Sequence, residues 1–186
     1  MPWQHRSSLR TGFSPVMSEI RGFPPISGPG AAILILGSMP GRESLAQQRY
    51  YAHPRNVFWP IMCDLFDIRE SGYAQRVEKL VQNKVAVWDV LQTCFRSSSL
   101  DSDIDNKSIV PNDFERFFAV QPHIGHVYFN GAKAEAVYLN RVLPNLQGFA
   151  SELLLHRLPS TSPAHASMSF EQKKHAWRAV LNLGLE

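Results

Sequence analysis

Four short apolar runs, separated by helical patterns, constrain the fold of this chain most. They lie at residues 31–38, 84–91, 123–130 and 152–159. Each is rich in β-branched, aliphatic or aromatic residues and ends at a polar residue or a Gly/Pro break, a pattern typical of a buried strand. Strands that alternate with helices indicate a parallel sheet covered on both faces. We therefore predict an α/β fold, a three-layer α/β/α sandwich with a central four-stranded parallel sheet.

The segments around these runs carry the helical patterns that such a sandwich needs. The predicted helices are residues 58–68, 73–83, 111–120, 132–143 and 169–183. Asn112 is the candidate N-cap of the third helix, with Glu115 three places later, and Ser169 and Gln172 form a capping pair for the last. The proline-rich segment 22–30 resists helix formation, so we expect it to lie extended along the edge of the domain.

The length of 186 residues suits a single domain with one sizeable core. Residues 1–21 are polar without sustained periodicity, which predicts a flexible N-terminal arm, and residues 22–186 are expected to form one domain. No apolar stretch approaches the roughly 20 residues that cross a bilayer. The N-terminal segment also lacks the apolar core of a secretory signal. We therefore expect a cytoplasmic protein.

The cysteine count and the charge exclude some classes of protein. Cys63 and Cys94 are the only cysteines, too few for a disulfide scaffold, a four-cysteine zinc site or a Cys-ligated iron–sulfur cluster. Both have apolar neighbours, so we expect inert thiols. The net charge of +3 permits binding to a polyanion without requiring it.

Ligands of such sheets bind at the carboxyl ends of the strands, so the residues that follow each run are candidate site residues. The first run ends in GSMPG (37–41), whose small residues let a ligand approach the backbone. By itself this loop is better explained as a strand-to-helix turn, and no Walker G-K-[ST] follows it. The second run ends near Asp89, a general base or, by preference, a structural carboxylate. The third ends at Asn130, although Asn-Gly is also an ordinary turn.

Aromatic and amide groups are dense in RYYAHPRNVFW (49–59). One of its two adjacent tyrosines can offer a ring face for stacking. Asn56 carries a donor and an acceptor, which suits the edge of a base or a bound water molecule. Phe58 and Trp59 begin a predicted helix, and we expect them to belong to the core.

The fourth run ends in LPSTSPAHAS (158–167), which is rich in hydroxyl groups. Hydroxyls and backbone amides before a helix suit a phosphate, and an ordinary Ser/Pro loop is an equally good explanation. His165 is a loop anchor or, less readily, a donor to a base or phosphate. Together the strand ends offer hydroxyls, rings and neutral amides, with no metal ligand set and no nucleotide loop. They predict a ligand with a flat, uncharged ring system on a phosphate backbone.

Three motifs in this order, GSMPG (37–41), HPRNVFW (53–59) and LPSTSPAH (158–165), resemble the uracil-DNA glycosylase superfamily. Together with GFPP, VWDVL, PNDF and FNGAKAEA they are most similar to its hypoxanthine-DNA (DNA-deoxyinosine) glycosylase branch. The match spans roughly residues 22 to 180. The resemblance implies a uracil-DNA glycosylase-like fold and a monofunctional DNA glycosylase.

The first motif departs from the family pattern at Met39. Mismatch-specific relatives have an asparagine there, and other branches have Asp or Asn nearby, whereas a thioether accepts hydrogen bonds poorly and does not polarise water. In the hypoxanthine branch, catalysis is assigned to the asparagines of the HP-x-N and FNG segments. The resemblance therefore implies catalytic roles for Asn56 and Asn130. It leaves open which amide holds the water and which holds the leaving base.

The resemblance also implies binding roles. The implied base-binding residues are Gly37, Ser38, Met39, Tyr51 and Phe58, with Tyr51 at the place where relatives stack a ring on the extruded base. The implied DNA-binding residues are His53, Pro159, Ser160, Thr161, Ser162 and His165. The expected partner is DNA that contains deaminated bases. No metal and no cofactor is expected, and the protein is expected to act as a monomer.

These features predict a DNA repair enzyme that extrudes a deaminated base, hydrolyses its N-glycosidic bond and leaves an abasic site. Hypoxanthine is the first expected substrate, with uracil or xanthine next. One alternative is an enzyme that acts mainly on uracil. Another is a non-catalytic lesion-binding module, because Met39 replaces the usual catalytic group. A third is an unrelated α/β nucleotide-binding protein, against which the missing Walker and dinucleotide motifs count.

Overall fold

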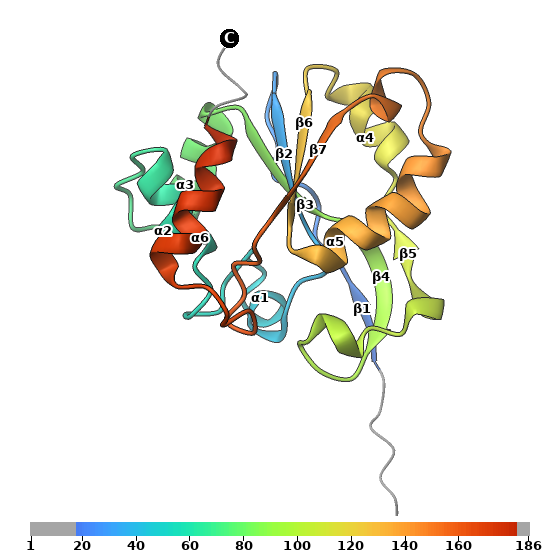
Figure 1. Cartoon of the computed structure of the whole chain (residues 1–186), viewed down its shortest axis with the longest axis horizontal. Helices are drawn as coiled ribbons and strands as arrows, with labels where there is room; N and C mark the ends of the chain where they lie inside the picture. The colour runs from blue at the N-terminus through green and yellow to red at the C-terminus, as the bar shows by residue number, and fades with distance from the viewer. Residues whose placement is uncertain (1–17, 182–186) are drawn as a thin grey trace, which may run out of the picture.

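A computed structural model of the chain describes residues 18–181. Its centre is a four-stranded parallel sheet in the order β3-β2-β6-β7, as Figure 1 shows. The strands are β2 (Ile33–Gly37), β3 (Val85–Asp89), β6 (His126–Asn130) and β7 (Leu154–Leu158). All four predicted strands are therefore confirmed. The register pairs Gly37 with Asp89 and Asn130 with Leu158, so the carboxyl ends of the strands meet at one edge.

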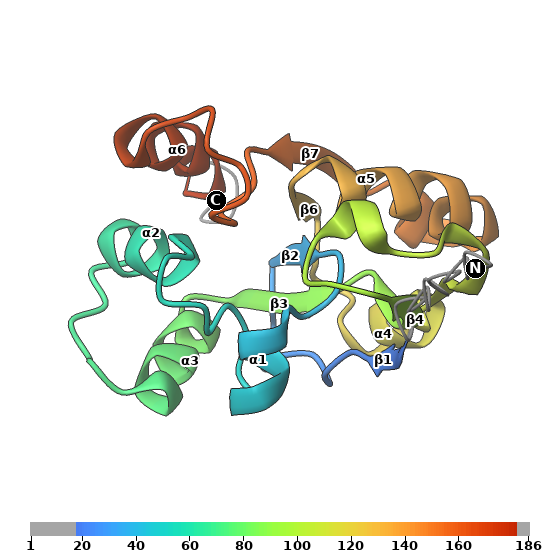
Figure 2. The same cartoon turned by 90° about the horizontal axis from the view of Figure 1, so that it is seen from below.

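Helices cover both faces of this sheet, as predicted. One face carries α2 (Phe58–Leu65), α3 (Tyr73–Gln82) and α6 (Phe170–Trp177). The other carries α4 (Phe114–Val120) and α5 (Ala132–Val137), and Figure 2 shows both layers from below. The predicted helix 132–143 is α-helical only to Val137 and continues as a π-helical turn. Among the described residues, no helix combines the length and the apolar character needed to cross a bilayer.

Aromatic packing joins the helices to the sheet. Every residue of β2 and β3 is buried, as expected for strands with a helix layer on each face. Trp88 of β3 packs against Phe114 and Phe117 of α4, with ring centroids 5.1 and 4.9 Å apart. On the opposite face, Phe58 meets Trp177 edge to face at 6.0 Å. Both contacts lie close to the strand ends that the sequence indicated as the site.

Of the two predicted helix caps, one is confirmed and one is wrong. Ser169 and Gln172 form a reciprocal capping box at the start of α6. At α4 the N-cap is Asp113, not Asn112, and its carboxylate accepts a 3.0 Å hydrogen bond from the amide three residues on. The side chain of Asn112 instead donates to the carbonyl oxygen of Asp89 at 2.8 Å. The side chain of Asn112 is therefore bonded to the end of β3, and Asp113 caps the helix.

A second, antiparallel sheet in the order β1-β4-β5 was not predicted. Its strands are β1 (Ser18–Arg21), β4 (Leu91–Arg96) and β5 (Val110–Pro111). Only Val90 separates β3 from β4, so the sequence reads as one apolar run although the chain changes sheets there. The predicted arm was wrong for residues 18–21, which pair with β4, and residues 1–17 lie outside the described residues.

Two further segments, α1 (Arg42–Gln47) and residues 22–30, complete the fold near β3 and β2. The short helix α1 was not predicted, because only Ser44 in it is buried and it has no apolar stripe. The segment 22–30 lies along the edge of the sheet as predicted, since Ile26 exchanges two 2.8 Å backbone hydrogen bonds with Val87 of β3.

Candidate active site

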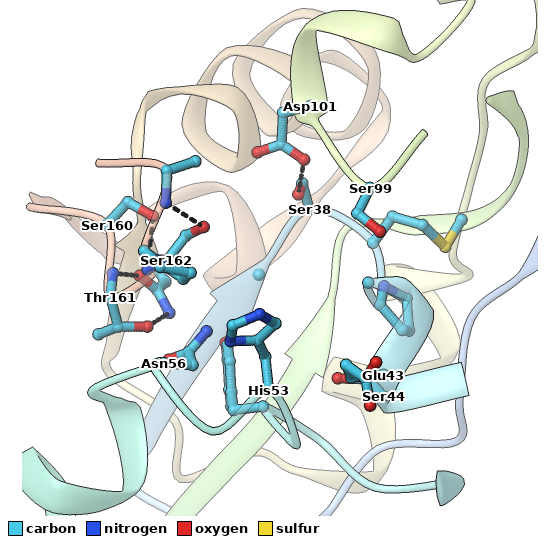
Figure 3. A pocket seen from close by; sticks show the side chains of 18 of the residues that line it. Ser38, Glu43, Ser44, His53, Asn56, Ser99, Asp101, Ser160, Thr161 and Ser162 are labelled. Carbon is cyan, nitrogen blue, oxygen red and sulfur yellow. Dashed lines mark hydrogen bonds between the residues drawn. The ribbon is translucent and has the colours of Figure 1, made fainter. Parts of the chain in front are cut away.

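A cavity of about 700 Å³ opens at the carboxyl ends of β2, β3 and β6 (Figure 3). Four loops surround it: the first-motif loop 37–41, the loop 50–56 before α2, the loop 99–101 after β4, and the loop 160–165 before α6. The loops 37–41 and 160–165 connect a strand of the parallel sheet to a helix, whereas the loop 50–56 joins α1 to α2 and the loop 99–101 follows β4. The position agrees with the rule that such sheets bind ligands beyond their carboxyl edge.

The cavity brings together most of the predicted site residues. Those that line it are Gly37, Ser38, Met39, Tyr51, His53, Asn56, Asn130, Ser160, Thr161, Ser162 and His165. Phe58 and Pro159 do not line it. Phe58 is fully buried behind Tyr51, and the carbonyl of Pro159 accepts a 2.9 Å hydrogen bond from the indole of Trp177.

Asn56 presents a free amide nitrogen to the cavity. Its side-chain oxygen accepts a 3.0 Å hydrogen bond from the backbone amide of Phe58, at the first turn of α2. Its own backbone amide donates to the carbonyl of His53 at 2.8 Å, which closes the turn. The Nδ2 group has no hydrogen-bond acceptor among the residues that the structure describes. A held carboxamide with unused donors can therefore donate to a ligand without reorganising.

Asn130 fastens the end of β6 to the loop 160–165. It is 8 % exposed, and its Oδ1 accepts from the backbone amide of Thr161 at 2.8 Å while its Nδ2 donates to the Thr161 hydroxyl at 2.9 Å. Thr161 is fully buried. One N–H and one lone pair of the Asn130 amide remain for other partners. The two predicted asparagines thus share one cavity but differ in how freely their side chains can act.

The ring of Tyr51 is held in a defined place beside the cavity. Its backbone has φ = +56°, a left-handed conformation that is uncommon for an aromatic residue. One face of the ring stacks on Phe58, with centroids 3.9 Å apart and an interplanar angle of 24°. Burial and the nearby carboxylate of Asp89 raise the pKa of the Tyr51 hydroxyl, although the amide of Asn130 opposes the change. The phenol therefore stays protonated and can donate.

Asp89, at the end of β3, also lines the cavity, although its sequence context favoured a structural role. Its side chain is 3 % exposed, and its Oδ2 has no hydrogen-bond partner in the described part of the chain. Burial raises the pKa of this carboxyl to about 7, Asp101 adds to the rise and Arg96 opposes it. In the sequence Asp89 was indicated only by its position near the end of the second apolar run, and the register opposite Gly37 places it at the same edge as the first motif.

Gly37 is required because Asp89 and Tyr51 crowd its α-carbon. A Cβ at this position would collide with Oδ1 of Asp89 and lie 3.1 Å from the Tyr51 hydroxyl. The first motif therefore needs a glycine at its first position for close approach. The Asp89 carboxyl group and the Tyr51 hydroxyl, which come from separate segments, both lie against the backbone of Gly37.

Two residues that no motif indicated, Asp101 and Lys173, hold residues of the cavity in place. Ser38 donates a 2.6 Å hydrogen bond to Asp101, which lies in the loop after β4 (Figure 3). Lys173 of α6, 5 % exposed, donates to the carbonyl oxygens of His165 at 2.6 Å and Ser162 at 3.4 Å. Its burial lowers the pKa of this ammonium group. Lys173 thus holds two carbonyl groups of the loop 160–165 in place.

The donor set of the cavity suits neutral hydrogen bonding. No group of three or more His, Cys, Asp or Glu side chains within residues 18–181 is placed to hold a metal ion. What converges is a free carboxamide, a buried phenol, a buried carboxyl group and hydroxyls on the opposite loop. Such a set can hold an uncharged heterocycle by its edge and a phosphate by its backbone.

Comparison with known proteins agrees with this geometry. Curated relatives named hypoxanthine DNA glycosylase occur in Methanosarcina acetivorans, 33 % identical over 162 residues, and in Methanosarcina barkeri, 32 % identical over 159 residues. The matches cover 86 % and 84 % of this chain, and 96 % and 94 % of the relatives. A solution NMR structure from Methanosarcina acetivorans, of a protein proposed to be a uracil DNA glycosylase, has a TM-score of 0.71 and 29 % identity. It covers 89 % of this chain and 100 % of its own. The family model of the uracil DNA glycosylase superfamily matches residues 24–183, so the chain belongs to this superfamily.

Proposed function

We propose that this protein is a DNA glycosylase that removes hypoxanthine from deoxyinosine in DNA and leaves an abasic site. The observation that supports this most directly is the shared cavity of Asn56, Asn130 and Tyr51, two neutral carboxamides and a stacked ring without a carboxylate in the first motif. The relatives named hypoxanthine DNA glycosylase match over nearly their whole length. The proposal takes DNA with a deaminated base as the partner and includes action as a monomer.

Base extrusion into this cavity has an energetic rationale. Taking a base out of a duplex costs a few kcal/mol, and less when the base is mispaired, as hypoxanthine often is after deamination of adenine. Phe58 covers one face of Tyr51, so the other face is the one that can stack on the extruded base. Such stacking offsets about 1–3 kcal/mol of the cost. Ser160 and Ser162 also line the cavity, where their hydroxyls can bind the flanking phosphates.

The chemical step separates the base from the sugar. The bond between C1′ and N9 breaks, its electron pair stays with the base, and the sugar becomes an oxocarbenium-like cation to which water adds. The Asn56 amide donates to the departing base, which accumulates negative charge, and this needs no proton transfer. Asn130 positions the loop 160–165 through Thr161, and its remaining N–H or lone pair can hold the water. Met39 supplies only an apolar wall.

The proposal is tested by incubating the protein with a duplex oligonucleotide that carries one deoxyinosine. Mass spectrometry of the small-molecule fraction should find free hypoxanthine, and alkali should cleave the strand at the abasic site. A matched duplex with uracil distinguishes an enzyme that acts mainly on uracil. Binding of the inosine duplex without release of base would instead support a non-catalytic lesion-binding module.

Replacing Gly37 with alanine should strongly reduce base release. The added methyl group would displace the Asp89 carboxyl group and the Tyr51 hydroxyl, and shifts of roughly 1 Å at such a site can cost about 100-fold in rate. Gly41, in the same motif, has nothing within 4 Å of an added Cβ and is the matched control. Single-turnover assays of Gly37→Ala and Gly41→Ala make the comparison. Equal rates for the two variants would contradict the crowding argument.

A further inference from the structure

A second cavity, of about 270 Å³, is lined by β1, α1 and the end of β4. Its lining residues include Ser18, Arg42, Leu45, Arg96, Ser97 and Ser98. Arg42 lines the active-site cavity as well, so the two cavities are neighbours. In Figure 1, α1 and β1 both lie at the lower end of the molecule. No motif of the sequence indicated this second cavity, and the proposed reaction does not use it.

Arg96 is a buried cation whose hydrogen-bond donors are mostly unused. Its side chain is 2 % exposed, and its Nη2 donates to the carbonyl of Pro40 at 2.6 Å. Its Nε and Nη1 have no hydrogen-bond partner within residues 18–181, and none of the ion pairs in that part of the chain includes it. Burying a guanidinium group without an anion is costly. Since Arg96 lines the second cavity, its unused donors indicate an anionic ligand there.

Arg42 adds a second guanidinium group to the same cavity. Its Nη2 donates to the carbonyl of Ser97 at 2.9 Å, which ties the side chain to the residue after β4. Burial lowers the pKa of the Arg96 guanidinium, nearby acidic groups oppose this change, and the positive charge of Arg42 adds to it. The two cations therefore repel each other, and an anion bound between them would remove this repulsion.

The carboxylate of Glu19 does not compensate this positive charge. The register of β1 and β4 pairs Ser18 with Arg96 and Glu19 with Phe95. Directly opposed residues of an antiparallel pair share a face, and successive residues alternate between faces. Ser18 and Arg96 therefore lie on one face of the small sheet, and Glu19 and Arg21 lie on the other. Glu19 forms no ion pair within the described residues.

The chemistry of the second cavity suits a tetrahedral oxyanion. A guanidinium group has N–H donors in a planar fork that matches two oxygens of a phosphate, and the serine residues beside it can add hydroxyl donors. We propose that the second cavity is a phosphate-binding site in which Arg42 and Arg96 hold the phosphoryl oxygens. The phosphate belongs either to the DNA backbone or to a free phosphate group, which offers the same oxygens.

The position of the site favours the DNA backbone as the source, and this part of the inference rests on the proposed function. A strand whose base enters the active-site cavity passes Arg42, which lines both cavities. Successive phosphates of one strand are separated by about 3.4 Å of helix rise, so the phosphate of a flanking nucleotide can reach the second cavity. A phosphate contact does not read the base. It should therefore strengthen binding of unmodified and inosine-containing DNA equally.

Arg42→Gln is the variant that tests the site, with Arg116→Gln as its matched control. Arg116 lies on α4 and lines neither cavity, so its substitution removes the same charge elsewhere. Fluorescence anisotropy at several salt concentrations measures binding of an unmodified and an inosine duplex. Arg42→Gln should weaken binding of both about tenfold and reduce the slope of log K against log salt by about 0.9. Arg42→Lys should restore most of the slope but not the full affinity, because an ammonium group lacks the planar fork.

Uncharged methylphosphonate linkages, placed one at a time around the lesion, distinguish the two sources of phosphate. If a DNA phosphate occupies the site, one such linkage weakens binding by the wild type and by Arg116→Gln but has no further effect on Arg42→Gln. If no linkage separates the proteins, but phosphorus NMR shows that inorganic phosphate binds the wild type and not Arg42→Gln, the source is a free phosphate group. If neither measurement separates Arg42→Gln from the wild type, the inference is overturned.

Arg96→Lys tests the buried partner of the site. It keeps the charge but removes the unused Nη1 donor, so it should also lose the effect of that linkage or the binding of inorganic phosphate. Wild-type behaviour of a folded Arg96→Lys variant overturns the inference, and if circular dichroism shows that it does not fold, the Arg42 variants decide. These measurements need no base release. A wild type that releases no hypoxanthine removes the proposed function and leaves the test of the phosphate site intact.

Discussion

Asn56→Ala is expected to slow base release about 10²–10³-fold while binding of inosine-containing DNA largely survives. Among the described residues, Nδ2 of Asn56 has no acceptor, whereas Nδ2 of Asn130 donates to the hydroxyl of Thr161. Its oxygen is held by the backbone amide of Phe58, so the free N–H groups have a fixed direction. Single-turnover rates report the chemical step, and a gel-shift or anisotropy titration reports binding.

Asn56→Asp is the matched control for this substitution. The aspartate keeps the oxygen that accepts from Phe58, so the first turn of α2 keeps its hydrogen bond. It loses the donors and adds a negative charge beside the departing base. We therefore expect Asn56→Asp to be as slow as Asn56→Ala. High activity of the aspartate variant would instead assign Asn56 to holding the water, and full activity of both variants would exclude a catalytic role.

Asn130→Ala should lower both stability and activity. It leaves the fully buried amide and hydroxyl of Thr161 without their partner, and a buried group that loses its hydrogen bond costs about 1–3 kcal/mol. The loop 160–165 would then lose its attachment to the end of β6. Thermal unfolding measures the first effect. Single-turnover base release, measured at a temperature where the variant is folded, measures the second and should fall more than tenfold.

Thr161→Val separates the two hydrogen bonds of this pair. Valine removes the hydroxyl that accepts from Asn130 but keeps the backbone amide that donates to it. Its loss of stability and of rate should therefore be smaller than that of Asn130→Ala. If both variants release base at the wild-type rate, the attachment of the loop does not matter for the reaction, and Asn130 is not a site residue.

The central sheet was predictable because each of its strands is a short apolar run with a clear break after it. The strands of the second sheet are not short apolar runs that end at a clear break. In β4, exposed and buried residues are mixed, and the strand follows β3 after one residue, so the sequence reads as a continuation. In β5 there are only two residues. These segments are strands because they pair with each other in the folded protein, and this pairing leaves no pattern in the sequence.

The same reasoning separates the site residues that motifs revealed from those they did not. Asn130 stood out at a strand end and Asn56 in a dense cluster of aromatic residues, and the resemblance to the superfamily implied their catalytic roles. Asp89 was assigned a structural role because its burial at the cavity, with Oδ2 unpaired among the described residues, arises only on folding. Lys173 lies on a helix far from any strand end, and its burial beneath the loop 160–165 follows from packing alone.

The segment 22–30 has a consequence for how copies of this protein behave in concentrated solution. A bare outer strand of a sheet invites pairing with the same strand of another molecule, the first step of aggregation. Ile26 pairs with the backbone N–H and C=O of Val87 on β3, and the three prolines of the segment have no amide N–H to offer another strand. The carbonyl of Pro24 also accepts from the Tyr50 hydroxyl at 3.2 Å. Resistance to self-association and the placement of the tyrosine loop therefore depend on the same stretch of chain.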